Sequence, residues 1–212
     1  MPTSLRPTAV HSVPDRWSIP IRMHVASPEP VDLDPTPDRF AHENIFTFVR
    51  AMPSDIVRIE AMFRRCSVQS RRLRFFRPVP SAPYGYLEEV LADREMRHVF
   101  VIEKDGEPIG LAELHLIGPR SGSLALIVED QYQRRGVGTA ALGLLLCRVR
   151  QLGLRVVEAD LLFENSAVLR ALRRVGPASV SWADDIFHDE LELESADLTE
   201  ECRVASGLPA AV

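Results

Sequence analysis

The sequence is poor in cysteine and has no long apolar run. Its three cysteines, Cys66, Cys147 and Cys202, lie far apart and form no CxxC pair, so neither a zinc knuckle nor a redox motif is indicated. An odd number of widely spaced cysteines is expected of reduced thiols in the cytosol. No stretch approaches the roughly 20 apolar residues of a membrane span, and residues 1–20 lack the apolar core of a secretion signal. We therefore expect a cytoplasmic protein without a metal site and without a membrane partner.

Basic residues are in the minority, with 25 Lys and Arg against 30 Asp and Glu and a net charge of −5. This balance disfavours nucleic acid as a partner, because a global electrostatic grip on phosphates needs excess positive charge. The rest of the composition is ordinary for a folded domain, at 46% hydrophobic and 26% charged. A chain of 212 residues is long enough for one domain with tails.

Proline is concentrated at the start, where the first 42 residues hold half of the 16 prolines. Proline fixes φ and removes a backbone donor, so residues 1–43 are predicted to form a largely disordered leader. Within the leader, apolar residues alternate with polar residues or Pro20 from Trp17 to Val25, which is typical of an edge strand. We expect a folded domain over 44–194 and a flexible tail over 195–212.

The folded region alternates between strand and helix patterns. Strands are expected near 45–50, 98–103, 109–117, 123–128, 155–163, 180–183 and 186–193, and helices near 56–63, 69–75, 84–91, 136–152 and 166–175. Asp105-Gly106 predicts a two-residue hairpin turn, because glycine tolerates the positive φ that such turns require. The order predicts an α/β protein in which helices pack on a mixed sheet.

The most informative stretch runs from Leu124 to Thr139. An apolar strand is followed by Gln133-Arg134-Arg135-Gly136-Val137-Gly138-Thr139 and then at once by an apolar helix. Two glycines one residue apart let the backbone turn tightly and approach a ligand. The helix presents unpaired N–H groups and its positive dipole end, which together with the arginines suit a phosphate. Simple turn chemistry is the alternative, and neither a Rossmann nor a Walker motif is complete here.

In this context the segment Gln133–Gly138 resembles the pyrophosphate-binding motif Q/R-x-x-G-x-G/A of the GCN5-related N-acetyltransferase (GNAT) superfamily. The run that begins Glu164-Asn165-Ser166-Ala167 resembles the second signature of that superfamily. Residues 70–76 and 93–96 are similar to segments of its bacterial protein-lysine acetyltransferase (Pat-like) branch. The resemblance covers roughly residues 44–194. It implies a mostly antiparallel, twisted sheet of six or seven strands flanked by about four helices.

The resemblance also implies an N-acetyltransferase with acetyl-CoA as co-substrate, which transfers an acetyl group directly to an amine of a protein lysine or a small molecule. The pantetheine arm of acetyl-CoA would pair with the backbone of the strand Leu126-Ile127-Val128. The pyrophosphate of acetyl-CoA would lie on the N–H groups from Arg134 to Thr139. The implied cofactor-binding residues are Leu126, Ile127, Val128, Gln133, Arg134, Arg135, Gly136, Val137, Gly138, Thr139 and Asn165.

The expected general base is missing from its position. The resemblance implies a glutamate on the strand before the phosphate loop, where this chain has Ser123, which acts at most as a relay through water. Glu113 and His115 share a face of the preceding strand, where they either act as base or point to solvent. Glu158 and Asp160 share a face of the following strand, and Asp160 is a candidate to line the acceptor cleft. The catalytic candidates are therefore Glu113, Ser123 and Asp160.

The acid that protonates the departing thiolate is replaced as well, because the spacing from Asn165 puts Leu172 where many relatives have tyrosine. The loss of both groups leaves a second function open, an acyl-CoA-binding regulatory module of the same fold with little or no turnover. Nine acidic residues and no Lys or Arg lie between Asp184 and Glu201. Such a run either forms a solvated strand face and tail or attracts a cationic amine substrate electrostatically.

Overall fold

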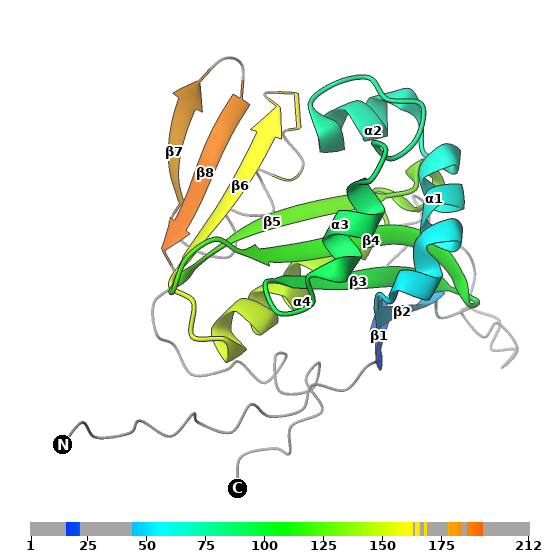
Figure 1. Ribbon diagram of the computed structural model, residues 1–212, viewed down its shortest axis with the longest axis horizontal. Helices are drawn as coiled ribbons and strands as arrows, with labels where there is room; N and C mark the ends of the chain where they lie inside the picture. Colours follow the sequence, from blue (N-terminus) through cyan, green and yellow to red (C-terminus); the bar gives the residue numbers. More distant parts are fainter. Residues whose placement is uncertain are drawn as a thin grey trace, which may run out of the picture.

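The computed structural model describes residues 16–21, 44–162, 164, 165, 168, 178–183 and 186–192. These residues form one sheet of eight strands in the order β1-β2-β3-β4-β5-β6-β8-β7 (Figure 1). Its strands are β1 (Arg16–Ile21), β2 (Asn44–Arg50), β3 (Arg97–Lys104), β4 (Glu107–Leu116), β5 (Ser121–Val128), β6 (Val156–Leu162), β7 (Ala178–Ala183) and β8 (Ile186–Glu192). All neighbours are antiparallel except β5 and β6, which are parallel.

The strand count exceeds the expected six or seven because β1 adds a strand at the β2 edge. This strand lies in the leader and overlaps the stretch, Trp17 to Val25, whose alternation predicts an edge strand. The α-helices with described bounds are α1 (Ile56–Arg65), α2 (Val68–Phe75), α3 (Tyr86–Ala92) and α4 (Val137–Gln151). The helix expected over 166–175 lies outside the described residues, apart from Val168, which is helical.

Local turn chemistry accounts for the boundaries that the sequence predicts best. Asp105 and Gly106 have φ of 53° and 82° between β3 and β4, so the expected two-residue hairpin is confirmed. Gly153, with φ of 68°, follows the end of α4, where a left-handed residue closes many helices.

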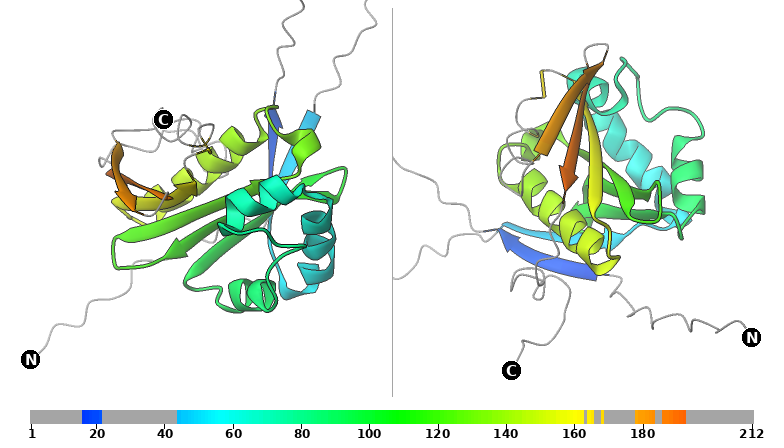
Figure 2. Two further views of the ribbon diagram at one scale, coloured as in Figure 1. Left: turned by 90° about the horizontal axis from the view of Figure 1, so that it is seen from above. Right: turned by 90° about the vertical axis from the view of Figure 1, so that its left-hand side faces the viewer.

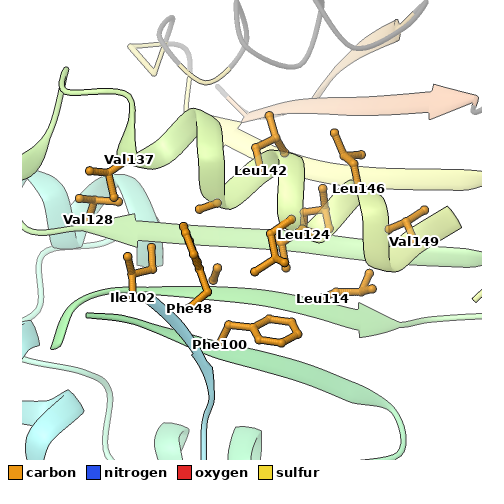
Figure 3. Packing of buried hydrophobic residues seen from close by; sticks show 14 of the residues in the cluster. Phe48, Phe100, Ile102, Leu114, Leu124, Val128, Val137, Leu142, Leu146 and Val149 are labelled. Atoms are coloured by element: carbon orange, nitrogen blue, oxygen red, sulfur yellow. The ribbon is translucent and has the colours of Figure 1, made fainter. Parts of the chain in front are cut away.

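Helices lie on both sides of the sheet (Figure 2), and an apolar cluster packs on each side. We call the side covered by α1, α2 and α3 the front face and the side covered by α4 the back face. Side chains alternate across a strand, so Leu111 packs in the front cluster with α1 and α3, and Ala112 packs in the back cluster with α4. Figure 3 shows the back cluster, in which strand residues Phe48, Phe100, Leu114 and Leu124 lie against Val137, Leu142, Leu146 and Val149 of α4.

The cysteines depart in one respect from the expectation of reduced thiols. Cys66 is buried and free, whereas Cys147 is disulfide-bonded, so the expectation is wrong for Cys147.

In the part of the chain that the structure describes, no helix combines the length and the apolar character needed to cross a bilayer.

A buried histidine on the back face makes stability depend on pH. His98 is 5% exposed, its Nδ1 accepts a 2.9 Å hydrogen bond from Nη1 of Arg50, and it faces Arg148 of α4. Burial, followed by the charges of Arg148 and Arg50, lowers the pKa of His98 from 6.5 to about 4. Below pH 6.5 the unfolded chain therefore binds a proton that the folded chain does not, so stability falls as pH falls.

We expect the His98→Gln variant to lose that pH dependence. Between pH 7.5 and pH 4 the wild type should lose up to about 3 kcal/mol of unfolding free energy through this group, from the linkage of the two pKa values. Urea unfolding at the two pH values measures the difference for both proteins. If the variant loses as much stability as the wild type, the pH dependence comes from other groups.

Candidate functional site

The sheet opens between β5 and β6. The two strands pair only from Ser121–Ser123 to Val156–Glu158. Beyond these pairs β5 continues to Val128 and β6 to Leu162, and Figure 1 shows the two strands diverging. Within the described residues, the later parts of both strands therefore have no strand partner across this opening.

The register with β4 shows which backbone groups of β5 face the opening. Glu129 N–H donates to the Ile109 carbonyl at 2.8 Å, and Ile117 N–H donates to the Ser121 carbonyl at 3.1 Å. In an antiparallel pair the hydrogen-bonded positions alternate, so the odd-numbered residues of β5 bond to β4. The N–H and C=O groups of the even-numbered residues Leu124, Leu126 and Val128 point away from β4 and toward β6.

This alternation corrects one of the predicted strand contacts. Ile127 lies opposite Leu111 in the β4 register, and its side chain is 4% exposed in the front cluster. Neither its backbone nor its side chain therefore faces the opening. Leu126 and Val128 do fit the expected backbone pairing, and Leu124, which the sequence analysis missed, has the same orientation. Strand alternation identifies Leu124 only once the β4–β5 register is known.

The loop after β5 ends in an open helix terminus. Arg134 and Gly136 have φ of 57° and 83°, and α4 begins at Val137 without a side-chain cap. The first intrahelical bond runs from Ala140 N–H to the Gly136 carbonyl, at 2.9 Å. The N–H groups of residues 137–139 consequently have no partner within the helix. Left-handed residues in such a turn direct successive N–H groups into one concavity that suits an anion.

The side chains of this loop divide into exposed and buried ones. Arg134, Arg135 and Thr139 are exposed, so both guanidinium groups can reach an anion at the helix terminus. Val137 is fully buried in the back cluster and contributes only its N–H. A Cβ added at Gly138 would lie 3.7 Å from Cδ2 of Leu126, so this glycine lies beside one of the β5 residues that face the opening.

Gln133 fastens the loop to the rest of the domain. Its Nε2 donates to the Val128 carbonyl and to Oγ of Ser70, both at 2.8 Å. The structure therefore gives the predicted cofactor contact Gln133 a positioning role, because its amide N–H groups are already used within the protein. The glutamine of the motif holds the end of β5, the loop and α2 together.

Asp130 joins the same loop to the start of α2. Its carboxylate accepts hydrogen bonds from Ser67 N–H at 2.7 Å, Ser67 Oγ at 2.6 Å and Ser70 Oγ at 2.8 Å. Burial raises the pKa of Asp130, but the hydrogen bonds from Ser67 and Ser70 outweigh it and hold the pKa below its usual value. The neighbouring Glu129 is 4% exposed and pairs with Nε of Arg65 at 3.1 Å.

Glu113 does not suit the role of a free general base, nor does it point to solvent. It is 5% exposed beneath α2 and α3, and its Oε1 accepts from Nη2 of Arg74 at 2.7 Å and from the Tyr86 hydroxyl. Nη2 of Arg74 also donates to the Tyr86 oxygen at 2.6 Å. Burial, reinforced by the Glu113 charge, raises the pKa of Tyr86 well above 10. The three side chains form a closed, buried group.

The other two catalytic candidates lie at the opening. Ser123 pairs with His115 on β4 and with Glu158 on β6, so these three side chains form a row across the front face. Asp160 lies two residues further along β6, opposite His188 of β8, on the same face. Ser123 is half-buried, whereas Glu158 and Asp160 are exposed. The structure thus brings Ser123, Glu158 and Asp160 together and separates Glu113 from them.

Helix α2 bridges the far end of the opening. Beyond β6, Glu164 accepts a 2.9 Å hydrogen bond from Nε2 of Gln69 and pairs with Arg72. The predicted cofactor residue Asn165 is half-buried there, and its N–H donates to the Leu162 carbonyl at 2.7 Å. Leu172, at the expected tyrosine position, lies outside the described residues. Among the residues that the structure describes, no three His, Cys, Asp or Glu side chains are placed to hold a metal ion.

Comparison with known proteins gives one family and a consistent set of folds. The model of the acetyltransferase (GNAT) family matches residues 64–176. The GNAT domain of PAT from S. lividans superposes with a TM-score of 0.66 at 22% identity, over 71% of this chain and 92% of that chain. The ribosomal-protein-S18-alanine N-acetyltransferase from Escherichia coli has a TM-score of 0.56 at 15% identity, over 73% and 97%. Spermidine N-acetyltransferase from Vibrio cholerae, solved with CoA and spermine, has 0.51 at 18%, over 69% and 95%.

Proposed function

The chain belongs to the acetyltransferase (GNAT) family, and on that premise we propose that it transfers an acetyl group from acetyl-CoA directly to an amine of a protein lysine or a small molecule. The observation that carries this proposal is the uncapped N-terminus of α4 beside the open edge of β5. An anion site and a row of free backbone groups, joined end to end, match a ligand that has a diphosphate at one point and an amide-containing arm beyond it.

The residues present fit that ligand. The N–H groups of Val137, Gly138 and Thr139 would hold the pyrophosphate, with Arg134 and Arg135 adding positive charge. The open backbone groups of Leu124 and Leu126, and the N–H group of Val128, whose carbonyl already accepts from Gln133, would pair with the amides of the pantetheine arm. The bound coenzyme would supply the activated acetyl group.

The length of β5 predicts where the acetyl group would lie. From Val128 to Ser123 the strand rises by about 17 Å, at about 3.3 Å per residue. An extended arm that starts at the α4 terminus and follows β5 would therefore end near Ser123 and Glu158, where the two strands meet. This end of the opening lies on the front face beside His115 and Asp160, so an amine would approach it there.

The names of two similar structures support an amine as acceptor, since one acts on spermidine and the other on the alanine of a ribosomal protein. A lysine amine, with pKa near 10.4, costs on the order of 4.6 kcal/mol to deprotonate at pH 7. A terminal α-amine, with pKa of about 7.7–8.0, costs much less. A base therefore matters most for a lysine.

A second candidate function, an acyl-CoA-binding regulatory module, is favoured by the serine at the position of the expected carboxylate. Calorimetry with CoA, combined with a thiol-release assay using acetyl-CoA and either spermine or a lysine peptide, separates the two functions. We expect saturable CoA binding together with acceptor-dependent release of thiol. Binding without release would support the regulatory module, and absence of binding would exclude both functions.

A further inference from the structure

Most carboxylates on or beside β4, β5 and β6 are already engaged. Glu113 is paired with Arg74, Glu129 with Arg65, and Glu164 with Arg72, while Asp130 accepts three hydrogen bonds from the start of α2. Asp160 also takes part in an interaction. A carboxylate held in this way is a poor proton acceptor, because protonation breaks its ion pair or hydrogen bonds.

Glu158 differs from these residues. It is exposed, and across the described part of the chain its carboxylate has no ion pair and no hydrogen bond. Its neighbours along β6, Val157 and Ala159, are buried in the back cluster, so the Glu158 side chain lies on the front face. It is therefore anchored by a rigid strand while its carboxylate stays accessible.

The register places Glu158 beside the position where the expected base is missing. Ser123 and Glu158 form the last pair before β5 and β6 diverge. Neighbouring strands lie about 4.8 Å apart, a distance that a glutamate side chain spans. A carboxylate on β6 at this pair can consequently occupy nearly the same space as one on β5. The coenzyme arm that the proposed function requires would end at this pair.

We propose that Glu158 is the general base of the transfer reaction, in place of a carboxylate at Ser123; this rests on the proposed function. Glu158 accepts one proton from the acceptor ammonium group. The freed nitrogen lone pair attacks the acetyl carbonyl carbon, the C–N bond forms and the C–S bond breaks. The surplus proton on nitrogen passes to the departing thiolate to give the thiol, and Glu158 releases its proton to solvent.

His115, on the other side of Ser123, is less suited to this role. It belongs to β4, whose partner on that side is β5 itself, so a full strand separates it from the opening. Glu158 belongs to β6 and borders the opening directly. An imidazole also lacks the negative charge with which a carboxylate binds an ammonium group.

Chemical labelling tests the placement without any acceptor. Carbodiimide with glycine ethyl ester modifies accessible carboxylates, and peptide mass spectrometry reads Glu158 separately. We expect CoA to slow the labelling of Glu158 at least about tenfold, while adenosine 3′,5′-bisphosphate, which lacks the arm, does not. Labelling of Glu88, exposed on α3, should not change with either ligand. CoA that binds by calorimetry but leaves Glu158 labelling unchanged would overturn this proposal and leave the proposed function standing.

Kinetics with spermine and a lysine peptide test the role. Glu158→Gln keeps the shape of the side chain and should lower kcat/KM at pH 7 by about 10²–10⁴-fold, the usual worth of a general base, with CoA affinity unchanged. The loss should shrink as pH rises and the free amine becomes abundant. Adding Ser123→Glu to this variant should restore part of the rate, and Glu88→Gln should match the wild type. A Glu158→Gln variant with the wild-type rate and pH profile would refute the assignment.

Discussion

Arg74→Met is expected to lower the free energy of unfolding by about 3–5 kcal/mol, the cost of removing one partner from a buried ion pair. Arg74 is the cation that neutralises Glu113, and both side chains are largely buried, at 14% and 7% exposed. Methionine fills much of the same volume but leaves a carboxylate without a counter-charge. Burial opposes the charge on Arg74, yet Glu113 and Tyr86 outweigh it and raise the pKa of Arg74, so the guanidinium group stays charged throughout the ordinary pH range.

Arg72, two residues earlier on α2, provides the matched control. Its partner Glu164 is exposed, and exposed ion pairs contribute little to stability. We expect Arg72→Met to leave the urea midpoint nearly unchanged. In the double variant Arg74→Met/Glu113→Gln, much of the lost stability should return, because the buried group is then neutral. Equal, small losses for Arg72→Met and Arg74→Met would show that the buried group does not hold α2 and α3 on the sheet.

Gly136→Glu is expected to weaken CoA binding by about 100-fold or more, equivalent to at least about 2.7 kcal/mol. Gly136 is the N-cap residue of α4 and has φ of 83°, so its backbone forms part of the proposed phosphate site. A glutamate there places a negative charge where the diphosphate would bind and opposes it electrostatically. The left-handed conformation also costs a non-glycine residue about 1–2 kcal/mol.

Gly153→Glu separates that strain from the loss of binding. Gly153 follows the other end of α4 with φ of 68°, and nothing lies within 4 Å of an added Cβ. The control variant therefore carries the same residue change and a similar backbone strain on the same helix, far from the proposed phosphate site. Calorimetry with CoA should give wild-type affinity for Gly153→Glu only, with circular dichroism verifying both folds. An unchanged Kd in folded Gly136→Glu protein would contradict this placement of the site.

The features that could be predicted from the sequence are those set by residues close to one another in the chain. Asp105-Gly106 specifies a hairpin through its own φ preferences, and Gly136 and Gly138 mark a tight turn before a helix. The apolar periods of β5 and α4 identify a strand and a helix on either side. Each of these features depends on residues within a few positions of one another, so the sequence alone identifies the fold class and the family and predicts the phosphate loop.

The roles of the carboxylates were decided only by tertiary structure. Glu113 lies 39 residues from Arg74 and 27 from Tyr86 in the chain. No local sequence pattern predicts that these three side chains meet beneath α2 and α3. Glu158 comes beside Ser123 because β5 and β6 are parallel, and a parallel pair needs a long crossover, here through α4. Registers between distant strands depend on packing of the whole sheet. The chain alone therefore determines which acids are present, and the fold determines which of them are neutralised and which of them face the opening.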